Sequence, residues 1–291
     1  MKIARTTSSK EDEAYIIIND RGNAVTRGEI IQQIGIKLPR DPVCILSTEQ
    51  VYELEHVLPK LKYSHTISEF SLSYPIGDPP KIIFLNFNYR DQSGWIRFGK
   101  TLPHDPVFYL KPRTSLNGPY DDIRCPKFVT QLDFEGELAF VICKKCKNIS
   151  ENDASTTIGG YFVMNDVSAR DVQYVDIQVS RSKCFDTFAP CGPWIATRSE
   201  IPDPNKLSIT TMVNGEVRQN SSTANMVLRV EEIICKLSRV MTLEPGDIVA
   251  TGTPMGTILS SSGGKPWLKT GDVVEVNIDR VGAIKNRVVF E

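Results

Sequence analysis

Short runs of apolar residues, separated by turn residues, predict that this chain is built mainly of β-strands. Most of these runs are rich in β-branched and aromatic residues and have the length of a strand. They are YIIIND (15–20), KIIFLNF (81–87), VFYLKP (107–112), ELAFVI (137–142), YFVMN (161–165), PWIAT (193–197), LSITTMVNGEVRQ (207–219), DIVATGT (247–253) and DVVEVNI (272–278). The Asn214-Gly215 step inside the seventh run predicts a hairpin, because Asn-Gly suits a tight two-residue turn.

Apolar residues at helical spacing are fewer, and they divide the chain into two parts. Helices are predicted over 28–34, 48–61, 150–155 and 226–241, the third beginning after a Ser150 cap. The Pro- and Gly-rich segment SYPIGDPP (73–80) resembles a linker. We therefore expect a small N-terminal α+β domain over residues 1–75. A mainly β catalytic domain with a few covering helices is expected over 76–291, which gives an α+β fold class overall.

Composition and charge exclude several classes of partner. The 291 residues are 41% hydrophobic and 24% charged, as in an ordinary globular protein. The formal net charge of −1 provides no basic surface for nucleic acid or an anionic membrane. No apolar stretch approaches the length of a membrane span, and the N-terminal residues lack the features of a signal or transit peptide. We expect a cytoplasmic protein that acts on small molecules.

The cysteines predict reduced thiols rather than a disulfide framework. Their number, seven, is odd, and their spacing is irregular. Cys143 and Cys146 form a C-x-x-C pair, but no second pair or His cluster completes a zinc site. We expect a partly buried Cys143 and a surface Cys146.

Three carboxylates form the most informative chemical pattern. Glu135 and Glu137 in LDFEGELAFVI are two residues apart, so on a strand both side chains point to one face. Asp166 follows the strand-like run GGYFVMN, which places it at the end of a neighbouring strand. Three such groups repel one another unless a cation neutralises them. An all-oxygen ligand set suits Mg²⁺, Mn²⁺ or Ca²⁺ better than zinc. An E-x-E pair alone is also common on an exposed strand face, so the neighbouring motifs decide between these interpretations.

The order of motifs resembles the fumarylacetoacetate hydrolase superfamily over roughly residues 80–290. The motifs are NYRD, PVFYLKP, DFEGELAFVI, GGYFVMNDVSARDVQ, KCFDTFAPCGPW, NGEVRQ, LEPGDIVATGTP and GDVVEVNIDRVG. The resemblance implies a mixed β-sandwich roll, usually dimeric, that holds a divalent metal, commonly Mg²⁺ or Mn²⁺. It also implies chemistry on 2-oxo or 1,3-dicarbonyl acids: hydrolysis, decarboxylation, isomerisation or keto–enol tautomerisation.

The resemblance also implies roles for individual residues. Glu135, Glu137 and Asp166 match the metal ligands, and Lys183 matches the active-site lysine. The positions near substrate and metal are Arg170 and Gln173, and those that bind the substrate carboxylate are Gly252 and Thr253, with Tyr89 as a further substrate-binding candidate. From its residue type alone Arg170 could equally be a structural partner of Asp171 or another carboxylate.

One motif departs from the hydrolytic pattern. Hydrolytic members of the superfamily continue NYxxH with a Glu three residues later, a pair that activates water. Here Gln92 stands at the His position and Trp95 at the Glu position. Neither an amide nor an indole is a general base near neutral pH. His104, twelve residues after Gln92, is a candidate replacement, although a loop histidine is more often solvated. The catalytic candidates are therefore Lys183, Arg170, Gln92 and His104.

The combined prediction is a divalent-metal-dependent enzyme that forms or protonates an enolate of a 2-oxo or 1,3-dicarbonyl acid. Tautomerisation, isomerisation and decarboxylation, or rearrangement and cyclisation of a larger substrate, all fit, because none needs an activated water. A C–C hydrolase of acylpyruvate-like acids is the enzyme alternative. A metal-binding scaffold without turnover is the alternative that is not an enzyme. Mg²⁺ is the expected cofactor, and a homodimer is the expected assembly.

Overall fold

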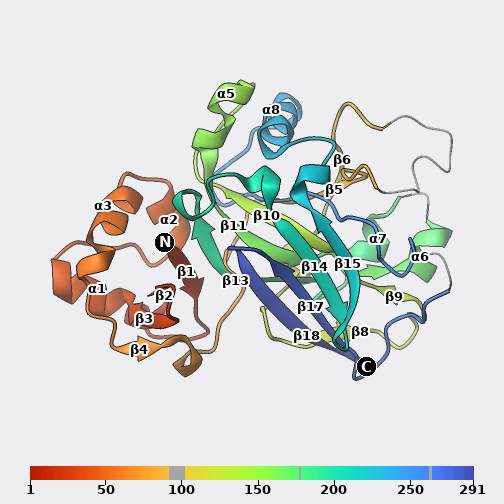
Figure 1. Cartoon of the computed structure of the whole chain (residues 1–291), viewed down its shortest axis with the longest axis horizontal. Helices are drawn as coiled ribbons and strands as arrows, with labels where there is room; N and C mark the ends of the chain where they lie inside the picture. The colour runs from red at the N-terminus through yellow and green to blue at the C-terminus, as the bar shows by residue number, and fades with distance from the viewer. Residues whose placement is uncertain (92–101, 177, 262–263) are drawn as a thin grey trace.

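Two β-sheets packed face to face form the body of the molecule, and the N-terminal residues extend one of them (Figure 1). The structure is a computed structural model that describes residues 1–91, 102–176, 178–261 and 264–291. No helix in these ranges is long and apolar enough to cross a membrane. The mainly β, α+β architecture predicted from the apolar runs is confirmed.

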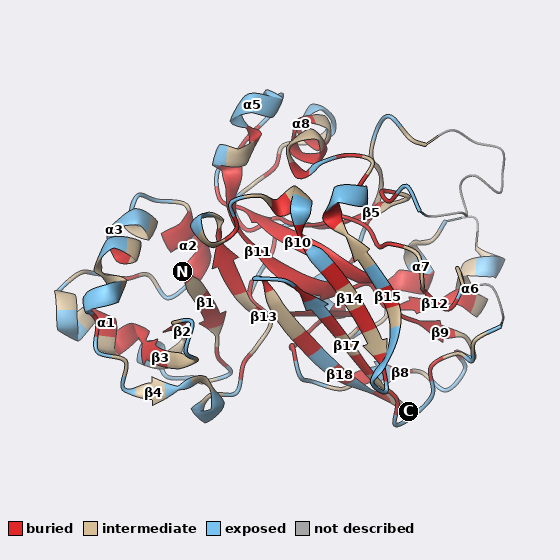
Figure 2. Ribbon diagram, in the orientation of Figure 1, coloured by how far each residue is buried: buried red, intermediate tan, exposed pale blue. Residues whose placement is uncertain are grey.

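The larger sheet has eleven strands in the order β4-β3-β2-β1-β13-β11-β10-β16-β5-β6, with β7 paired to β13. Their bounds are β1 Lys2–Arg5, β2 Tyr15–Ile18, β3 Asn23–Thr26, β4 His65–Thr66, β5 Ile82–Asn86, β6 Val107–Leu110, β7 Leu116–Asn117, β10 Gly136–Ile142, β11 Ile158–Asn165, β13 Ala189–Thr197 and β16 Ile248–Ala250. Strands β10 and β11 are buried along their whole length (Figure 2). That burial on both faces explains their near-continuous apolar sequences.

The second sheet, five strands in the order β15-β14-β17-β18-β8, covers one face of the first. Its strands are β8 Ile123–Cys125, β14 Ser208–Val213, β15 Glu216–Ser222, β17 Val273–Ile278 and β18 Gly282–Phe290. β14 and β17 pack against β10 and β11, and their buried positions alternate with more exposed ones. The Asn214-Gly215 turn joins β14 to β15, as its sequence predicts. A separate ladder pairs β9 Leu132–Asp133 with β12 Ser168–Ala169.

Helices cover the edges of this sandwich. In the N-terminal part they are α1 Arg27–Ile34, α2 Pro42–Leu46 and α3 Gln50–Val57, and in the remainder α5 Glu151–Ala154, α6 Arg170–Val175, α7 Ser180–Lys183 and α8 Val230–Val240. Ser150 caps α5 through its side chain, which accepts a hydrogen bond from the Asp153 amide, as expected. The region predicted as helix over 226–241 begins its helix only at Val230, because Met226 and Arg229 have extended backbone conformations.

The N-terminal strands continue the main sheet rather than forming a sheet of their own. β1 pairs antiparallel with β13, where Ile3 lies opposite Ile195, and β2, β3 and β4 follow outward. The division at residue 75 stays a prediction about domains. Both parts share one hydrogen-bonded sheet, so the N-terminal helices have a fixed place beside the body (Figure 1).

Candidate metal site

The three carboxylates identified in the sequence meet at adjacent ends of β10 and β11. Glu135 precedes β10, Glu137 is its second residue, and Asp166 follows the last residue of β11. The antiparallel register places Gly136 opposite Asn165, and the Asp166 amide donates to the Glu135 carbonyl over 2.8 Å. One oxygen from each carboxylate lies within 4.8 Å of the others. The period of the strand and the strand end thus bring these groups together as the sequence predicts.

Glu137 is fully buried, and only one of its two carboxylate oxygens has a hydrogen-bond partner among the described residues. Its Oε2 accepts a hydrogen bond from the Gly252 amide over 2.8 Å. Its Oε1 has no hydrogen-bond partner among the described residues. Burial and the neighbouring charges of Asp166 and Glu135 raise the pKa of the Glu137 carboxyl well above its usual value. An orphaned carboxylate oxygen in the interior is costly, and a cation bound there would supply its partner.

Asp166 is surrounded by positive charge. Lys111 Nζ lies 2.6 Å from its Oδ1, Lys183 Nζ lies 2.5 Å from its Oδ2, and the hydroxyl of Tyr109 donates to Oδ2. Burial alone would raise the pKa of Asp166, but the two ammonium groups hold it well below its usual value. Burial lowers the pKa of Lys111 despite this ion pair. Asp166 is therefore the anionic centre of the site.

Arg170 holds Glu135 from the other side. Its Nη2 contacts Glu135 Oε1 and lies 2.8 Å from Asp133 Oδ2, while its Nη1 donates to Gln173 Oε1 over 2.8 Å. Burial opposes the charge of this guanidinium, but the pKa of Arg170 is raised because both carboxylates stabilise the cation. Glu135 Oε2 meanwhile accepts from Lys183 Nζ over 2.8 Å. The interpretation of Arg170 as a structural partner of a carboxylate therefore applies to Glu135 and Asp133 rather than to Asp171.

The donor set fits a divalent cation of the Mg²⁺ or Mn²⁺ type. It supplies three carboxylates and no His or Cys, which is the chemistry of a hard ion. Four carboxylates face three basic side chains in the network formed by Asp133, Glu135, Glu137, Asp166, Lys111, Arg170 and Lys183. With every group charged the network is anionic by one unit, and a divalent ion would make it cationic by one.

The loop that follows β16 forms one wall of the site. Gly252, at φ +89°, directs its amide to Glu137, and an added Cβ there would lie 3.1 Å from Asn88 Cβ. The hydroxyl of Thr253 donates to the Gly136 carbonyl over 2.9 Å and accepts from Gln219 Nε2 over 2.8 Å. Both substrate-binding candidates of this loop thus lie against the strand that carries Glu137.

The remaining candidates lie in different places. Tyr89 is fully buried in the main apolar core, and burial raises the pKa of its phenol. His104 is exposed in the segment before β6. Gln92 and Trp95 lie outside the described residues.

Several residues of the site escaped the sequence reasoning. Lys111 and Tyr109 lie in the quoted PVFYLKP motif, Asp133 in DFEGELAFVI, and Gln219 in NGEVRQ. Each of these residues is buried. A Lys, Asp or Gln is seldom buried without a partner, so its place beside apolar residues in these motifs is the signal that could have identified it. The expectation of a surface Cys146 was wrong: it is 8% exposed, because its backbone pairs with Leu243.

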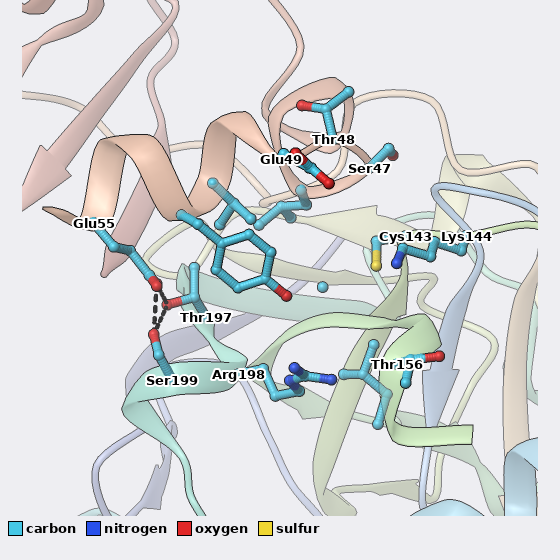
Figure 3. A pocket seen from close by; sticks show the side chains of 15 residues that line it. Ser47, Thr48, Glu49, Glu55, Cys143, Lys144, Thr156, Thr197, Arg198 and Ser199 are labelled. Carbon is cyan, nitrogen blue, oxygen red and sulfur yellow. Dashed lines mark hydrogen bonds between the residues drawn. The ribbon is translucent and has the colours of Figure 1, made fainter. Parts of the chain in front are cut away.

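A separate cavity of about 280 Å³ lies between the N-terminal helices and the body (Figure 3). It is lined from α2, α3 and the adjoining ends of β10, β11 and β13, and none of the three carboxylates reaches it. Glu55 accepts hydrogen bonds from the hydroxyls of Thr197 and Ser199 at its edge. The cavity thus belongs to the contact between the two parts of the chain rather than to the acidic site.

Comparisons with known proteins agree on one family. The model for the fumarylacetoacetate hydrolase C-terminal domain matches residues 81–289. A mitochondrial oxaloacetate tautomerase of Xenopus laevis is 45% identical over 226 residues, which cover 76% of this chain and 69% of that protein. The oxaloacetate tautomerase YisK of Bacillus subtilis is 39% identical over 228 residues, covering 78% of this chain and 75% of its own length.

Solved structures of other proteins match the fold of this chain over its whole length. One is maleylpyruvate hydrolase from Sphingobium sp. SYK-6 in complex with manganese(II) and pyruvate. It has a TM-score of 0.78 and 30% identity to this chain, and the match covers 100% of this chain and 99% of that one. The manganese and pyruvate belong to that protein. For this chain, the comparison shows that the whole fold, including the N-terminal part, has a solved counterpart.

Proposed function

The chain belongs to the fumarylacetoacetate hydrolase superfamily, and on that basis we propose that it is a divalent-metal-dependent tautomerase of a 2-oxo acid. The observation that carries the proposal is the group of the half-buried Glu135 with the buried Glu137 and Asp166, with Lys183 Nζ in contact with two of its members. Relatives named oxaloacetate tautomerases at 45% and 39% identity support an enzyme that interconverts keto and enol forms. The preferred substrate is a four-carbon 2-oxo diacid of that kind.

The carboxylates would hold the metal, and the surrounding residues would hold the substrate and its proton. A bound Mg²⁺ or Mn²⁺ supplies Lewis-acid stabilisation of an enolate oxygen. Lys183 is placed to exchange a proton at the carbon beside the carbonyl, since its nitrogen reaches both Glu135 and Asp166. Arg170 stays cationic and orients Glu135, and the loop at Gly252 and Thr253 is placed to receive the substrate carboxylate.

Charge complementarity favours an acidic substrate. The network has a net charge of −1 when every group is ionised, and a divalent cation brings it to +1. A carboxylate substrate is attracted to that field, and the charge that builds up on an enolate strengthens the attraction during the reaction. The same site holds no advantage for a neutral ketone. We infer that affinity follows the number of carboxylates on the substrate.

The test is a direct assay of enol decay. Enol absorbance in the ultraviolet is followed for oxaloacetate and for monocarboxylate 2-oxo acids, first in EDTA and then with Mg²⁺ or Mn²⁺ added. Metal-dependent acceleration that disappears in Glu135→Ala is the expected result. Stoichiometric release of a carboxylic acid from an acylpyruvate, without enol turnover, would instead establish the C–C hydrolase. Metal binding with no turnover of either kind would establish the scaffold.

A homodimer remains a proposal supported by exposed apolar residues. Phe128, Tyr174 and Val175 are 68%, 64% and 78% exposed, and the last two end α6, whose first residue is Arg170. Clusters of large exposed apolar side chains commonly mark protein contacts. Light scattering behind gel filtration gives the assembly directly, and a monomer at micromolar concentration would contradict it.

A further inference from the structure

Tyr109 brings a phenol hydroxyl to the buried ligand Asp166 from the edge of the main sheet. It lies on β6 opposite Phe84 of β5, and the two rings stack with their centroids 5.8 Å apart and their planes 12° apart. Tyr109 is 6% exposed, and its hydroxyl donates to Asp166 Oδ2. Because packing fixes the ring, it also fixes the direction from which the hydroxyl approaches that oxygen.

Three donors hold the carboxylate of Asp166, and they differ in how firmly they are placed. Lys111 Nζ lies 2.6 Å from Oδ1 and is tied to the backbone, because it also donates to the Phe188 carbonyl over 2.6 Å. Tyr109 is held at Oδ2 by the packing of its ring. Lys183 Nζ lies 2.5 Å from the same Oδ2 at the end of a flexible chain. Under the proposed function, Lys183 is the donor whose ammonium turns to the substrate.

The second contact of Lys183 shows which side of Oδ2 faces the other ligands. Its ammonium also donates to Glu135 Oε2 over 2.8 Å, so it lies between two of the three carboxylates. A carboxylate oxygen accepts in two lone-pair directions, and here Lys183 takes one and Tyr109 the other. A cation held between Glu135 and Asp166 would therefore take the direction that Lys183 now occupies. The hydroxyl of Tyr109 would then be the donor that stays at Oδ2.

We propose that Tyr109 is a positioning residue for the metal site: its hydroxyl keeps Asp166 Oδ2 in place when Lys183 leaves that oxygen. The inference rests on the proposed function for the metal and for the movement of Lys183. It deepens that function by naming the residue that holds a ligand while the lysine turns to the substrate. The hydroxyl matters more with metal bound than without it, because without metal Lys183 still donates to the same oxygen.

The experiment uses Tyr109→Phe, which removes the hydroxyl and keeps the ring that stacks on Phe84. Calorimetry measures the affinity of the metal-free protein for Mn²⁺. We expect that affinity to fall about tenfold, the lower end of the range for groups that orient metal ligands. The melting temperature in EDTA should fall by no more than about 3 °C, as for the loss of one hydrogen bond. Equal Mn²⁺ affinity in the variant and wild type would overturn the positioning role.

The matched control is Tyr15→Phe. Tyr15 is fully buried on β2, which β1 and β13 separate from β11, and its hydroxyl has no hydrogen-bond partner among the described residues. This variant also removes a phenol hydroxyl from the core, but it should leave the affinity for Mn²⁺ unchanged. A comparable loss of affinity in both variants would show that metal binding follows general packing, and would refute the role of Tyr109.

A second background tests the exchange with Lys183. In Lys183→Met, the hydroxyl of Tyr109 is already the donor that remains at Oδ2 before metal is added. Adding Tyr109→Phe to that variant should therefore lower the Mn²⁺ affinity by less than about threefold, against about tenfold when Lys183 is present. An equal loss in both backgrounds would refute the exchange.

The same titrations distinguish a failure of this inference from a failure of the proposed function. If wild-type protein binds neither Mg²⁺ nor Mn²⁺, the proposed function fails. If wild type binds Mn²⁺ and accelerates enol decay while Tyr109→Phe binds Mn²⁺ equally well, only the positioning role fails.

Discussion

Glu137 and Gly252 are joined by a hydrogen bond of 2.8 Å between the carboxylate Oε2 and the backbone amide. This bond ties the metal-site strand to the loop after β16, and it leaves Glu137 Oε1 as a buried oxygen without a partner among the described residues. The same side chain thus limits the stability of the metal-free protein and prepares the site for a cation. Stability and function are in conflict at this residue.

Glu137→Gln should therefore stabilise the metal-free protein and abolish its response to metal. The pKa of Glu137 is raised in the folded state, so its contribution to stability is present below the unfolded pKa of about 4.3 and is lost as pH rises toward the folded value. In EDTA at pH 8 the variant should melt at or above the wild-type temperature. Mg²⁺ should raise the melting temperature of wild type only. A metal-free variant that melts lower at pH 8 and keeps its response to Mg²⁺ would contradict this.

Lys183→Met should reduce turnover far more than metal binding. We expect kcat to fall by about 10² to 10⁴, the range for loss of a group that transfers a proton. Metal affinity should hold or rise, because the variant removes a cation that competes for Glu135 and Asp166. The control is Lys81→Met, which deprives the buried Asp247 of an ammonium 2.8 Å away but lies outside the site. Comparable losses of kcat in both variants would mean that Lys183 acts through stability alone.

Arg170→Lys should weaken metal binding even though the charge is kept. A lysine cannot bond Asp133, Glu135 and Gln173 together as the guanidinium fork does. Residues that orient metal ligands typically cost about 10- to 100-fold in affinity when they are changed, and calorimetry with Mn²⁺ measures that loss. Arg181→Lys breaks a similar fork between the exposed Arg181 guanidinium and Asp176, and should change nothing measurable.

Sequence reasoning located the carboxylates but not the residues that support them. Glu135 and Glu137 are two apart on a strand, so their shared face follows from local geometry, and motif order added Asp166 and Lys183. The supporting roles of Lys111, Asp133 and Gln219 become visible only through contacts between segments far apart in the sequence. Gln219, for example, contacts Gly136 from the second sheet, 83 residues away. Nothing in a local pattern predicts that approach. The close packing of the Thr211 side chain, whose Oγ1 would lie 2.3 Å from a Cβ on Gly136, is equally invisible from the sequence alone.

Lys111→Met should destabilise the metal-free protein strongly, because it leaves Asp166 with one ammonium fewer and removes a donor from the Phe188 carbonyl at 2.6 Å. Breaking a buried ion pair from one side costs about 3–5 kcal/mol, which urea unfolding measures. The double variant Lys111→Met/Asp166→Asn should recover part of that loss, since no unpaired charge remains. If the double variant is as unstable as the sum of the single ones, the pair is not coupled.

His104→Ala should leave turnover of 2-oxo acids unchanged. The imidazole is exposed, whereas Lys183 is 1% exposed and in contact with the acidic site. A general base must lie within hydrogen-bond reach of the proton that it removes, and a solvated loop position does not provide that reach here. Rates of enol decay and of acylpyruvate cleavage are compared in wild type and variant at equal Mg²⁺. If only the variant loses carboxylic acid release, His104 activates a hydrolytic water. The tautomerase assignment would then be replaced by that of a hydrolase.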